Sequence, residues 1–382
     1  MMAEVKFEMH PLYDFLSEYK ELNTTGKYRP VAVGRYGIRT RESIYSKELA
    51  KDYSKNRLIF KNTLTVGMGS VQMDIGILTD DVVYSVSPAY HTYRIAGIDC
   101  NYLRYCLQAK NADMFSRYMK RGSRQGKSID LNAWIRYKIP VCDPFEQKEI
   151  VNNLDRVQRI VFKRQQELQS LDDLIKARFV EMFGDVIHND KCWDYCTFSE
   201  IASSRLGKML DSKQQTGNHS FPYLANFNVQ WFKFETDNLN QMDFDEADQE
   251  EFRLEDGDLL VCEGGEIGRC AVWHNQVQPC FFQKALHRVR CNQKMILPDY
   301  LSWWFKFNCD NKGFASIEGA KATIAHLPGA KLKKLQVVVP PIELQNQFVV
   351  FVKQVDKSKF AVQKALDKAQ LLFDSLMQQY FG

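Results

Sequence analysis

Apolar residues recur at alternating steps of three and four along two stretches of the chain, and this spacing predicts two long amphipathic helices. The first stretch, residues 146–183, contains no glycine or proline, and Gly184 follows it where a helix C-terminal cap belongs. At 1.5 Å per residue such a helix is about 55 Å long, which exceeds the width of a small domain. Basic residues interrupt the apolar positions at Arg164, Arg178 and Lys359. The apolar positions form one stripe along each helix, which we call its seam. The seam residues are Ile150, Leu154, Val157, Val161, Leu168, Leu171 and Ile175 in the first helix and Val352, Val355, Val362, Leu366 and Phe373 in the second.

The two helices belong to an internal repeat. A shift of 198 positions aligns residues 147–184 with residues 345–382 without a gap, and nine of the 38 aligned pairs are identical. Unrelated sequence of this composition gives about two identities. The whole chain is therefore a diverged duplication of a unit long enough for a globular domain and a long helix. The identical pairs are Gln147/Gln345, Val151/Val349, Val157/Val355, Phe162/Phe360, Gln165/Gln363, Leu168/Leu366, Leu174/Leu372, Phe183/Phe381 and Gly184/Gly382.

Apolar seams of this kind pair with a partner helix. The most economical partner is the other copy, which predicts an antiparallel pair with one globular domain at each end. The alternative is a long helix that lies on its own domain. We disfavour it because a helix of nearly forty residues extends beyond the surface that it would cover.

The segments outside the helices carry a mixture of strand and helix patterns. Short runs rich in Val, Ile, Leu and aromatic residues, such as residues 81–95 and 257–265, predict strands bounded by Gly, Asn or Asp. Helical patterns follow these runs, and we expect Trp303, Trp304 and Phe305 to lie in a core. The predicted fold is mixed α/β, with two globular domains related by a pseudo-twofold duplication and separated by two long antiparallel coiled-coil helices.

Proline-containing stretches precede both helices and mark the domain boundaries, because proline removes a backbone donor and restricts the residue before it. The predicted segments are a first globular domain at 1–138, a central spacer helix at 139–184, a second globular domain at 185–337 and a C-terminal spacer helix at 338–382.

Composition indicates a soluble, non-secreted protein. Hydrophobic residues make up 45% of the 382 residues, but the chain contains no run of eighteen apolar residues and no signal-like amino terminus. The ten cysteines lack paired CxxC spacing, so reduced and mostly buried thiols fit better than a zinc site, and no metal site is expected.

Basic residues are clustered although the formal net charge is only +4. The segments "VGRYGIRTR" (33–41) and "SRYMKRGSRQGKS" (116–128) contain no acidic residue, and a lighter basic segment, "IEGAKAT", occurs in the second half. Each cluster by itself fits a solvated surface better than a binding site. Their recurrence at matching places in both halves favours nucleic-acid binding.

Polar residues of the glycine-bounded loops are the candidate DNA contacts, because arginine binds guanine bidentately and Asn or Gln binds adenine. The aligned pair His91 and His287 fits either a contact with a base or a buried histidine whose ring nitrogens are hydrogen-bonded within the fold. The candidates are Arg35, Tyr36, Arg39, Arg41, His91, Arg121, Ser123, Arg124, Gln125 and Lys127 in the first half and Lys208, Lys213, Gln214, Gln215, Asn226, Asn228, Lys284, His287, Lys321 and Thr323 in the second.

Catalytic motifs are missing from the sequence. "GSRQGKS" places three residues between Gly122 and Gly126, whereas a phosphate-binding loop needs four. The pair Pro340-Pro341 follows Val339, so the Asn/Asp-Pro-Pro-aromatic tetrad of an amino-methyltransferase is absent. "VGMGS" and "EGGEIG" occupy corresponding places in the two halves and suggest structural turns. We therefore expect no catalytic residue in this chain.

The arrangement of these motifs resembles the DNA-specificity subunit of type I restriction-modification systems over essentially the full length. The resemblance is carried by "DPFEQKEIV" and "PPIELQNQFV" before the helices, by the terminal aromatic-Phe-Gly, and by "EGGEIG" and "LPGAKLKKLQVVVPP". The chain departs from the family pattern at Asp143-Pro144, where Pro-Pro is usual, and at Leu344, where Glu is usual. The first globular segment also lacks a clear "W…L" opening.

The resemblance implies a non-catalytic protein in the cytoplasm of a prokaryote. Two target-recognition domains would each recognise one half of a bipartite site on double-stranded DNA. Two methylation subunits would bind S-adenosylmethionine and flip the target adenine. Restriction/translocase subunits would use ATP and Mg. This chain itself would hold no cofactor.

Two other classes of function stay open from the sequence alone. A solitary bipartite DNA-binding regulator has the same architecture and differs only in its partners. A coiled-coil protein scaffold predicts no affinity for DNA and leaves the arginine-rich segment of the first half unexplained. An enzyme requires motifs that the sequence does not display.

Overall fold

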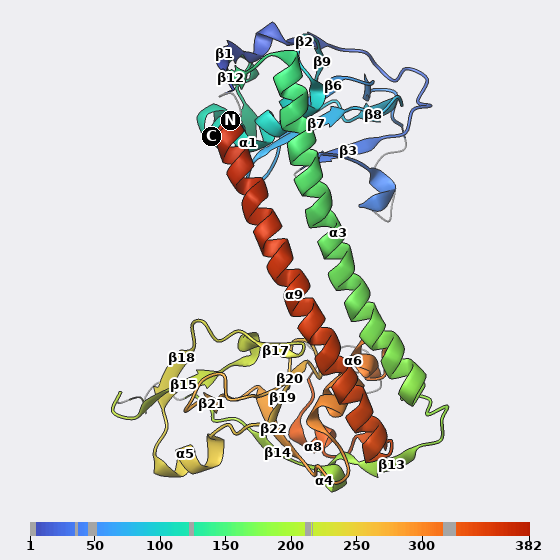
Figure 1. Ribbon diagram of the computed structural model, residues 1–382, viewed down its shortest axis with the longest axis vertical. Helices are drawn as coiled ribbons and strands as arrows, with labels where there is room; N and C mark the ends of the chain where they lie inside the picture. Colours follow the sequence, from blue (N-terminus) through green and yellow to red (C-terminus); the bar gives the residue numbers. More distant parts are fainter. Residues whose placement is uncertain are drawn as a thin grey trace. The chain divides into compact units, whose positions relative to one another are not determined.

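Two compact units make up the computed structural model, which describes residues 5–34, 37–44, 52–121, 126–210, 215, 217–315 and 326–382 (Figure 1). Unit 1 combines residues 1–166 with 363–382, and unit 2 comprises residues 167–362. The helices α3 (Pro144–Phe183) and α9 (Ile342–Phe381) are each 40 residues long. Each unit therefore contains one globular part and one end of each long helix.

Unit 1 is built on a four-stranded antiparallel sheet in the order β2-β9-β6-β7. The other described strands form the antiparallel pairs β1-β12, β3-β4, β5-β8 and β10-β11. The elements are β1 (Glu8–Pro11), β2 (Leu16–Tyr19), β3 (Val31–Gly34), β4 (Gly37–Thr40), β5 (Arg57–Ile59), β6 (Thr63–Met68), β7 (Met73–Leu78), β8 (Tyr84–Val86), β9 (His91–Ile95), α1 (Cys100–Tyr118), β10 (Met119–Arg121), β11 (Lys127–Ile129), α2 (Leu131–Trp134) and β12 (Lys138–Val141), with short 3-10 turns η1 (Leu12–Asp14) and η2 (Arg41–Ser43).

Unit 2 contains a second four-stranded antiparallel sheet in the order β14-β22-β19-β20. A three-stranded sheet, β18-β15-β21, and the pairs β13-β23 and β16-β17 accompany it. The elements are β13 (Asp194–Thr197), α4 (Phe198–Ile201), β14 (Ala202–Leu206), β15 (Ser220–Leu224), η4 (Asn226–Asn228), β16 (Val229–Gln230), β17 (Lys233–Phe234), β18 (Asn240–Asp243), α5 (Glu246–Phe252), β19 (Leu259–Cys262), β20 (Cys270–Val272), β21 (Phe281–Phe282), β22 (Leu286–Cys291), α6 (Pro298–Asp310), α8 (Gly329–Leu332) and β23 (Gln336–Val339).

The duplication predicted from the sequence is confirmed by equivalent hydrogen bonds in the two units. Tyr102 Oη donates to the carbonyl of Pro140 (2.9 Å), and Tyr300 Oη donates to the carbonyl of Val338 (3.0 Å). Both tyrosines lie on the helix that follows the four-stranded sheet, and both acceptors lie on the strand that precedes a long helix. The two sheets, these helices and these strands therefore form the same scaffold twice.

A buried glutamine at the start of each long helix repeats this correspondence. Gln147 Nε2 donates to the carbonyl of Cys142 (2.8 Å), and its Oε1 accepts from the backbone N–H of Asp99 (2.9 Å). Gln345 Nε2 donates to the carbonyl of Pro340 (2.8 Å), and its Oε1 accepts from the backbone N–H of Leu297 (2.9 Å). The identity of this aligned pair therefore reflects a structural role.

The start of α3 and the end of α9 are part of the core of unit 1. Ile150 and Leu154 are buried together with Phe373 and Phe381. The ring of Phe381 lies edge-on to Tyr102, with 5.2 Å between the centroids. The two helices run antiparallel here, because residues early in one pack with residues late in the other.

The end of α3 and the start of α9 pack in the same way in unit 2. Phe179 and Phe183 lie 5.5 and 5.4 Å from Phe348, measured between ring centroids. Gly184 then ends α3 with a φ of 74°, which confirms the predicted cap. This aromatic cluster joins the main core of unit 2.

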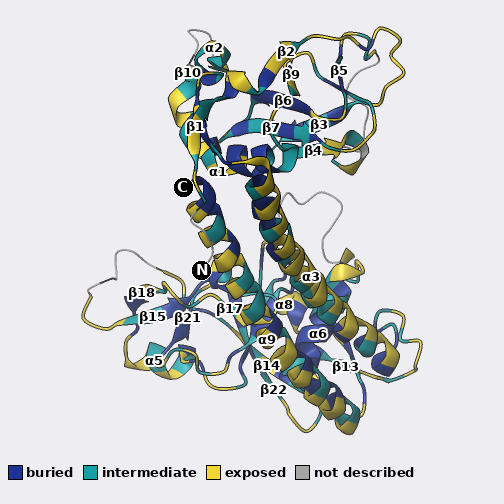
Figure 2. Ribbon diagram, turned by 45° about the horizontal axis from the view of Figure 1, so that its top comes forward, coloured by how far each residue is buried: buried dark blue, intermediate teal, exposed yellow. Residues whose placement is uncertain are grey.

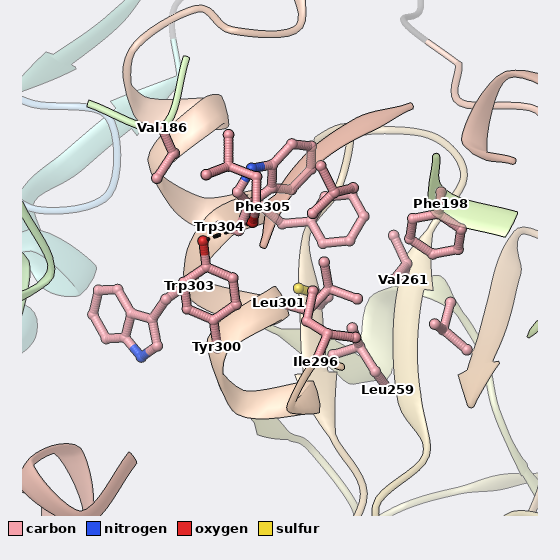
Figure 3. Close-up of a cluster of buried hydrophobic side chains, with 14 of the residues drawn as sticks. Val186, Phe198, Leu259, Val261, Ile296, Tyr300, Leu301, Trp303, Trp304 and Phe305 are labelled. Atoms are coloured by element: carbon pink, nitrogen blue, oxygen red, sulfur yellow. Dashed lines mark hydrogen bonds between the residues drawn. The ribbon is translucent and has the colours of Figure 1, made fainter. Parts of the chain in front are cut away.

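The core of unit 2 is rich in aromatic residues (Figure 3). Trp303, Trp304 and Phe305 of α6 are buried, as the sequence predicted. The same core includes Val261 of β19 and Phe198 of α4. Helix α6 is thereby held against the four-stranded sheet.

In α3 the predicted seam is buried toward both helix ends and half-buried from Val161 to Leu171, whereas in α9 the mid-helix residue Val362 is buried as well. Figure 2 shows that exposed and buried residues alternate along both helices. Two of the three basic interruptions are accommodated by local contacts in unit 2: Lys359 Nζ lies 2.6 Å from Asp172 Oδ1, and Arg178 lies over the ring of Phe351. No described helix is long and apolar enough to cross a membrane. The buried seam residues are Ile150, Leu154, Val157, Ile175, Val355, Val362 and Phe373, and the half-buried ones are Val161, Leu168, Leu171, Val352 and Leu366.

Substitution of Gln345 by alanine tests whether this buried glutamine stabilises unit 2. The change leaves the backbone N–H of Leu297 without its partner, and we expect unit 2 to lose about 2 kcal/mol of unfolding free energy. For a unit of this size the melting temperature falls by about 5 °C, which calorimetry measures. The matched control is Gln363→Ala, because Gln363 is exposed and bonds Asp367 on the same helix. Equal melting temperatures for the two variants would contradict the structural role.

Candidate nucleic-acid interface

Several chain segments of unit 1 meet at the end of the four-stranded sheet where β6 stops and β9 begins. Tyr90 Oη donates to the carbonyl of Val33 (2.9 Å), which joins the segment before β9 to β3. Lys127 Nζ donates to the carbonyl of Ser70 (3.3 Å), which joins the β10-β11 hairpin to the β6-β7 turn. We call these segments the turn edge of unit 1.

The corresponding end of the sheet in unit 2 also gathers several segments. Asn226 Nδ2 donates to the carbonyl of Gly264 (3.0 Å), and Gly264 forms a backbone bridge with His326. The backbone N–H of Lys284 donates to the carbonyl of Lys208 (2.8 Å). Because β19 and β22 are neighbouring strands, these two groups of segments adjoin each other. They form the turn edge of unit 2.

The two turn edges occupy equivalent places in the duplicated scaffold. Val66 of β6 pairs with His91, and Val261 of β19 pairs with His287. The β6-β7 turn and the β19-β20 loop therefore correspond, as the glycine pattern predicted. A Cβ atom on Gly69 would lie 2.3 Å from a backbone oxygen of its own turn, so this position requires glycine.

Three described candidates of the first half have distinct environments. Lys127 is exposed at the turn edge. His91 is half-buried, and its Nδ1 lies 2.9 Å from Glu18 Oε1. Arg41 is half-buried and lies over the ring of Tyr53, 5.7 Å from its centroid. Lys127 therefore has the most accessible positive charge of the three.

Arg39 lines a polar groove of about 1200 Å³ within unit 1. The groove lies beside β4, β7 and α1, and its walls include Gln72 of the β6-β7 turn. Gln158 of α3 and Gln370 of α9 line it as well. Arg39 thus shares an amide-rich groove with a residue of the turn edge.

Three further candidates of the second half, Asn226, Lys208 and Gln215, use their polar atoms inside unit 2. Asn226 Nδ2 donates to the carbonyl of Gly264, and its Oδ1 accepts from Arg269 Nη2. Lys208 Nζ donates to the carbonyl of Asp243 (2.8 Å) and pairs with Asp248. Gln215 Oε1 accepts from the backbone N–H of Asp243 (2.8 Å). Lys284, in contrast, is exposed at the turn edge.

Asn228 was expected to be exposed, and this expectation is wrong. For His287 the sequence left open a base contact or a buried histidine, and the structure shows a buried one. Asn228 is 3% exposed, and its amide bonds the backbone of Ala225 and Glu235. His287 is 1% exposed, and its Nε2 lies 3.1 Å from the carbonyl oxygen of Leu327. Burial lowers the pKa of His287, which favours the neutral ring. Both side chains are buried and hydrogen-bonded within unit 2, so neither is available to contact DNA.

The remaining candidates lie outside the described residues or have no described side chain. Arg121 pairs with Lys127 through the backbone of β10 and β11, and nothing further is described of its side chain. The candidates outside the described residues are Arg35, Tyr36, Ser123, Arg124, Gln125, Lys213, Gln214, Lys321 and Thr323.

Exposed apolar side chains on the turn edges were not predicted from the sequence. Val71 in the β6-β7 turn is 74% exposed, Met209 beside Lys208 is 65% exposed, and Phe227 is 57% exposed. Phe227 lies in the segment "ANFNVQ", where flanking asparagines indicate a turn. The sequence feature that could have identified this exposed ring is an aromatic residue between two turn-forming asparagines.

A protein-family model describes both halves of the chain. The model of the type I restriction modification DNA specificity domain matches residues 14–171 and 190–371. These two matches together include both four-stranded sheets and most of each long helix. No curated protein matches the chain in sequence.

Solved structures share the fold at low sequence identity. The S subunit of a type I restriction-modification system from M. genitalium matches 100% of this chain and 98% of its own, with a TM-score of 0.58 and 14% identity. A chain from a structure that describes complex assembly and conformational transition of the type I restriction-modification system matches 99% of this chain and 98% of its own, also with a TM-score of 0.58 and 14% identity. Since the family model matches both copies of the repeat, the protein belongs to the type I restriction modification DNA specificity domain family.

Proposed function

We propose that this protein is the DNA-specificity subunit of a type I restriction-modification complex, and that each unit recognises one half of a bipartite site on double-stranded DNA. The observation that carries the proposal is the presence of two equivalent turn edges on one duplicated scaffold. Turns at the end of a rigid sheet present side chains that vary without disturbing the core. Each turn edge is therefore suited to recognise its own short sequence.

The charged and polar residues of the turn edges support this assignment. Exposed Lys127 and Lys284 are suited to phosphate contacts, which position a protein on DNA without specifying sequence. Amide side chains such as Gln72 are suited to the base edges. The equivalent positions differ in residue type, so the two half-sites are expected to differ.

The paired long helices are suited to set the gap between the half-sites. In each unit the helix ends are buried in an aromatic core, as Phe381 is in unit 1 and Phe348 is in unit 2. Such anchoring resists slippage of the helices, because sliding either helix would expose buried rings. The length of the helices then fixes how many base pairs lie between the half-sites.

Exposed apolar residues that are identical in both copies support docking of two methylation subunits. Phe162 and Phe360 are 59% and 73% exposed, and Leu174 and Leu372 are 47% and 50% exposed. Core packing does not explain why these pairs stay identical when most aligned positions have diverged. A surface duplicated with the repeat suits two copies of one partner.

Catalysis in such a complex would lie outside this chain. The methylation subunits would hold S-adenosylmethionine and transfer its methyl group to adenine. Restriction subunits would use ATP and Mg for translocation and cleavage. This chain would supply the DNA sequence preference and the geometry of the site.

Substitution of Lys127 or Lys284 by alanine tests the phosphate contacts. We expect each variant to bind all duplexes more weakly and to reduce the slope of log affinity against log salt by about one. Fluorescence anisotropy over a salt series measures both effects. Lys61→Ala is the matched control, because Lys61 is exposed just before β6, at the opposite end of the sheet. An unchanged salt slope in both turn-edge variants would argue against this surface.

Substitution of Phe162 or Phe360 by aspartate tests the docking surface. We expect each single variant to bind one methylation subunit at full affinity and the second at least about tenfold more weakly, because a charge replaces a desolvated ring. Native mass spectrometry or multi-angle light scattering measures the stoichiometry. Val180→Asp is the control, because Val180 is exposed but aligns with Gln378. Two fully bound subunits in the double variant would rule out this surface.

Mapping of methylated sites tests the proposed function as a whole. DNA exposed to the complex with its methylation subunits is expected to carry N6-methyladenine in a split motif with a constant gap. Absence of methylation despite an assembled complex would contradict the function.

Shortening both helices tests the spacer. Deletion of residues 163–166 together with the aligned residues 361–364 removes about one turn, or about 6 Å, from each helix. We expect the gap to shrink by about two base pairs at 3.4 Å each. Alanine replacement of the same residues keeps the length and is the control. An unchanged gap in the shortened protein would refute the spacer.

A further inference from the structure

Phe227 presents an aromatic ring to solvent at the turn edge of unit 2. It is the middle residue of η4 and is 57% exposed. Within the described residues its ring belongs to none of the hydrophobic clusters and makes no aromatic contact. Its neighbours Phe221, Phe232 and Phe234, in contrast, pack against other rings of unit 2. The ring is therefore not part of the hydrophobic cores of unit 2, and more than half of its surface faces solvent in the free protein.

The backbone that carries Phe227 is held on both sides by side-chain hydrogen bonds. Asn226 Nδ2 donates to the carbonyl of Gly264 (3.0 Å), and Arg269 Nη2 donates to the carbonyl of Asn226 (3.0 Å). Asn228 Nδ2 donates to the carbonyl of Glu235 (3.0 Å). The turn is fixed against the β19-β20 loop and the residue that follows β17, so the ring projects from a rigid support.

The carbonyl of Phe227 itself is also bonded. Gln230 Nε2 donates to it at 3.0 Å. A ring on such a support keeps its position when it is pressed against a ligand, whereas a ring on a loose loop would retract. Rigid support is what an apolar side chain needs to open a stacked base step, because unstacking costs free energy.

The surroundings of the ring match DNA better than another protein surface. Lys284 is exposed on the same turn edge and supplies a positive charge. Gln230, beside the ring, is half-exposed and polar. The exposed Glu266 carboxylate of the β19-β20 loop lies 3.9 Å from Arg269 Nη1, which offsets its negative charge. An exposed aromatic ring beside polar and cationic groups is typical of surfaces that stack on bases while they neutralise phosphates.

We infer that Phe227 contacts the DNA by stacking its ring on a base at a partly opened step of the half-site recognised by unit 2. The inference rests on the proposed function and extends it to one residue that contacts a base. The contact requires an aromatic face, so an aliphatic side chain of similar size does not replace it.

Three substitutions of Phe227 separate stacking from simple apolar contact. In the complex with methylation subunits, Phe227→Ala is expected to bind the mapped site about ten- to hundredfold more weakly. Phe227→Trp is expected to bind within about threefold of the unsubstituted protein, because tryptophan also stacks. Phe227→Leu keeps an apolar side chain but not the ring, and it is expected to behave like the alanine variant.

Fluorescence of 2-aminopurine supplies a readout that loss of folding does not imitate. The probe replaces adenine or its neighbours one position at a time in duplexes of the mapped site, excluding the methylated adenine, which the methylation subunit flips. Binding is expected to increase the fluorescence at one step with phenylalanine or tryptophan at position 227. The increase is expected to disappear with alanine or leucine.

The control is Tyr195→Ala, which removes an aromatic ring that is 50% exposed on β13. We expect this variant to keep the affinity and the fluorescence signal. Unchanged binding by Phe227→Ala, or full retention of binding and signal by Phe227→Leu, would overturn the stacking contact. If the unsubstituted complex yields no split methylated motif, the proposed function itself fails. If the split methylated motif is present but Phe227→Ala leaves the binding affinity unchanged, only the stacking contact is overturned.

Discussion

Burial of the long-helix ends is the interaction on which both units depend. In unit 1, Phe373 and Phe381 at the end of the chain lie in the same core as Ile150 and Leu154. In unit 2, Phe348 closes the cluster formed by Phe179 and Phe183. A fully buried aromatic or aliphatic side chain contributes about 1.5–3 kcal/mol, so several of them outweigh the marginal stability of a domain. Neither core is complete without residues from both helices.

This constraint explains which parts of the duplicated scaffold stayed alike. The tyrosine that bonds the strand before each long helix and the glutamine at each helix start have no freedom to change without leaving buried groups unpaired. The turn edges lie at the ends of the sheets, where a substitution alters the surface and leaves the core intact. Such a division suits the proposed function, in which the scaffold is the same in both units while the residues proposed to contact DNA differ.

The aligned histidines illustrate how equal positions in the scaffold acquire different environments. His91 and His287 pair with equivalent valines of neighbouring strands. The segment at Leu327 covers His287 and bonds its ring, whereas His91 stays half-exposed beside Glu18. The difference arises from a segment some forty residues away along the chain, so no local pattern in the sequence contains it.

The sequence by itself determined the duplication, the two long helices, their seam and the mixed α/β class, because these depend on periodicity and on residues that repeat at a constant offset. It also indicated the aromatic core of α6 and the cap at Gly184. Only the tertiary structure decided which residues of the turns face solvent: Asn228 bonds the backbone around it, Lys208 pairs with Asp248, and the apolar ring of Phe227 is left exposed. Exposure of a turn residue depends on the segments that pack beside it, and contacts between distant segments leave no periodic signal along the chain.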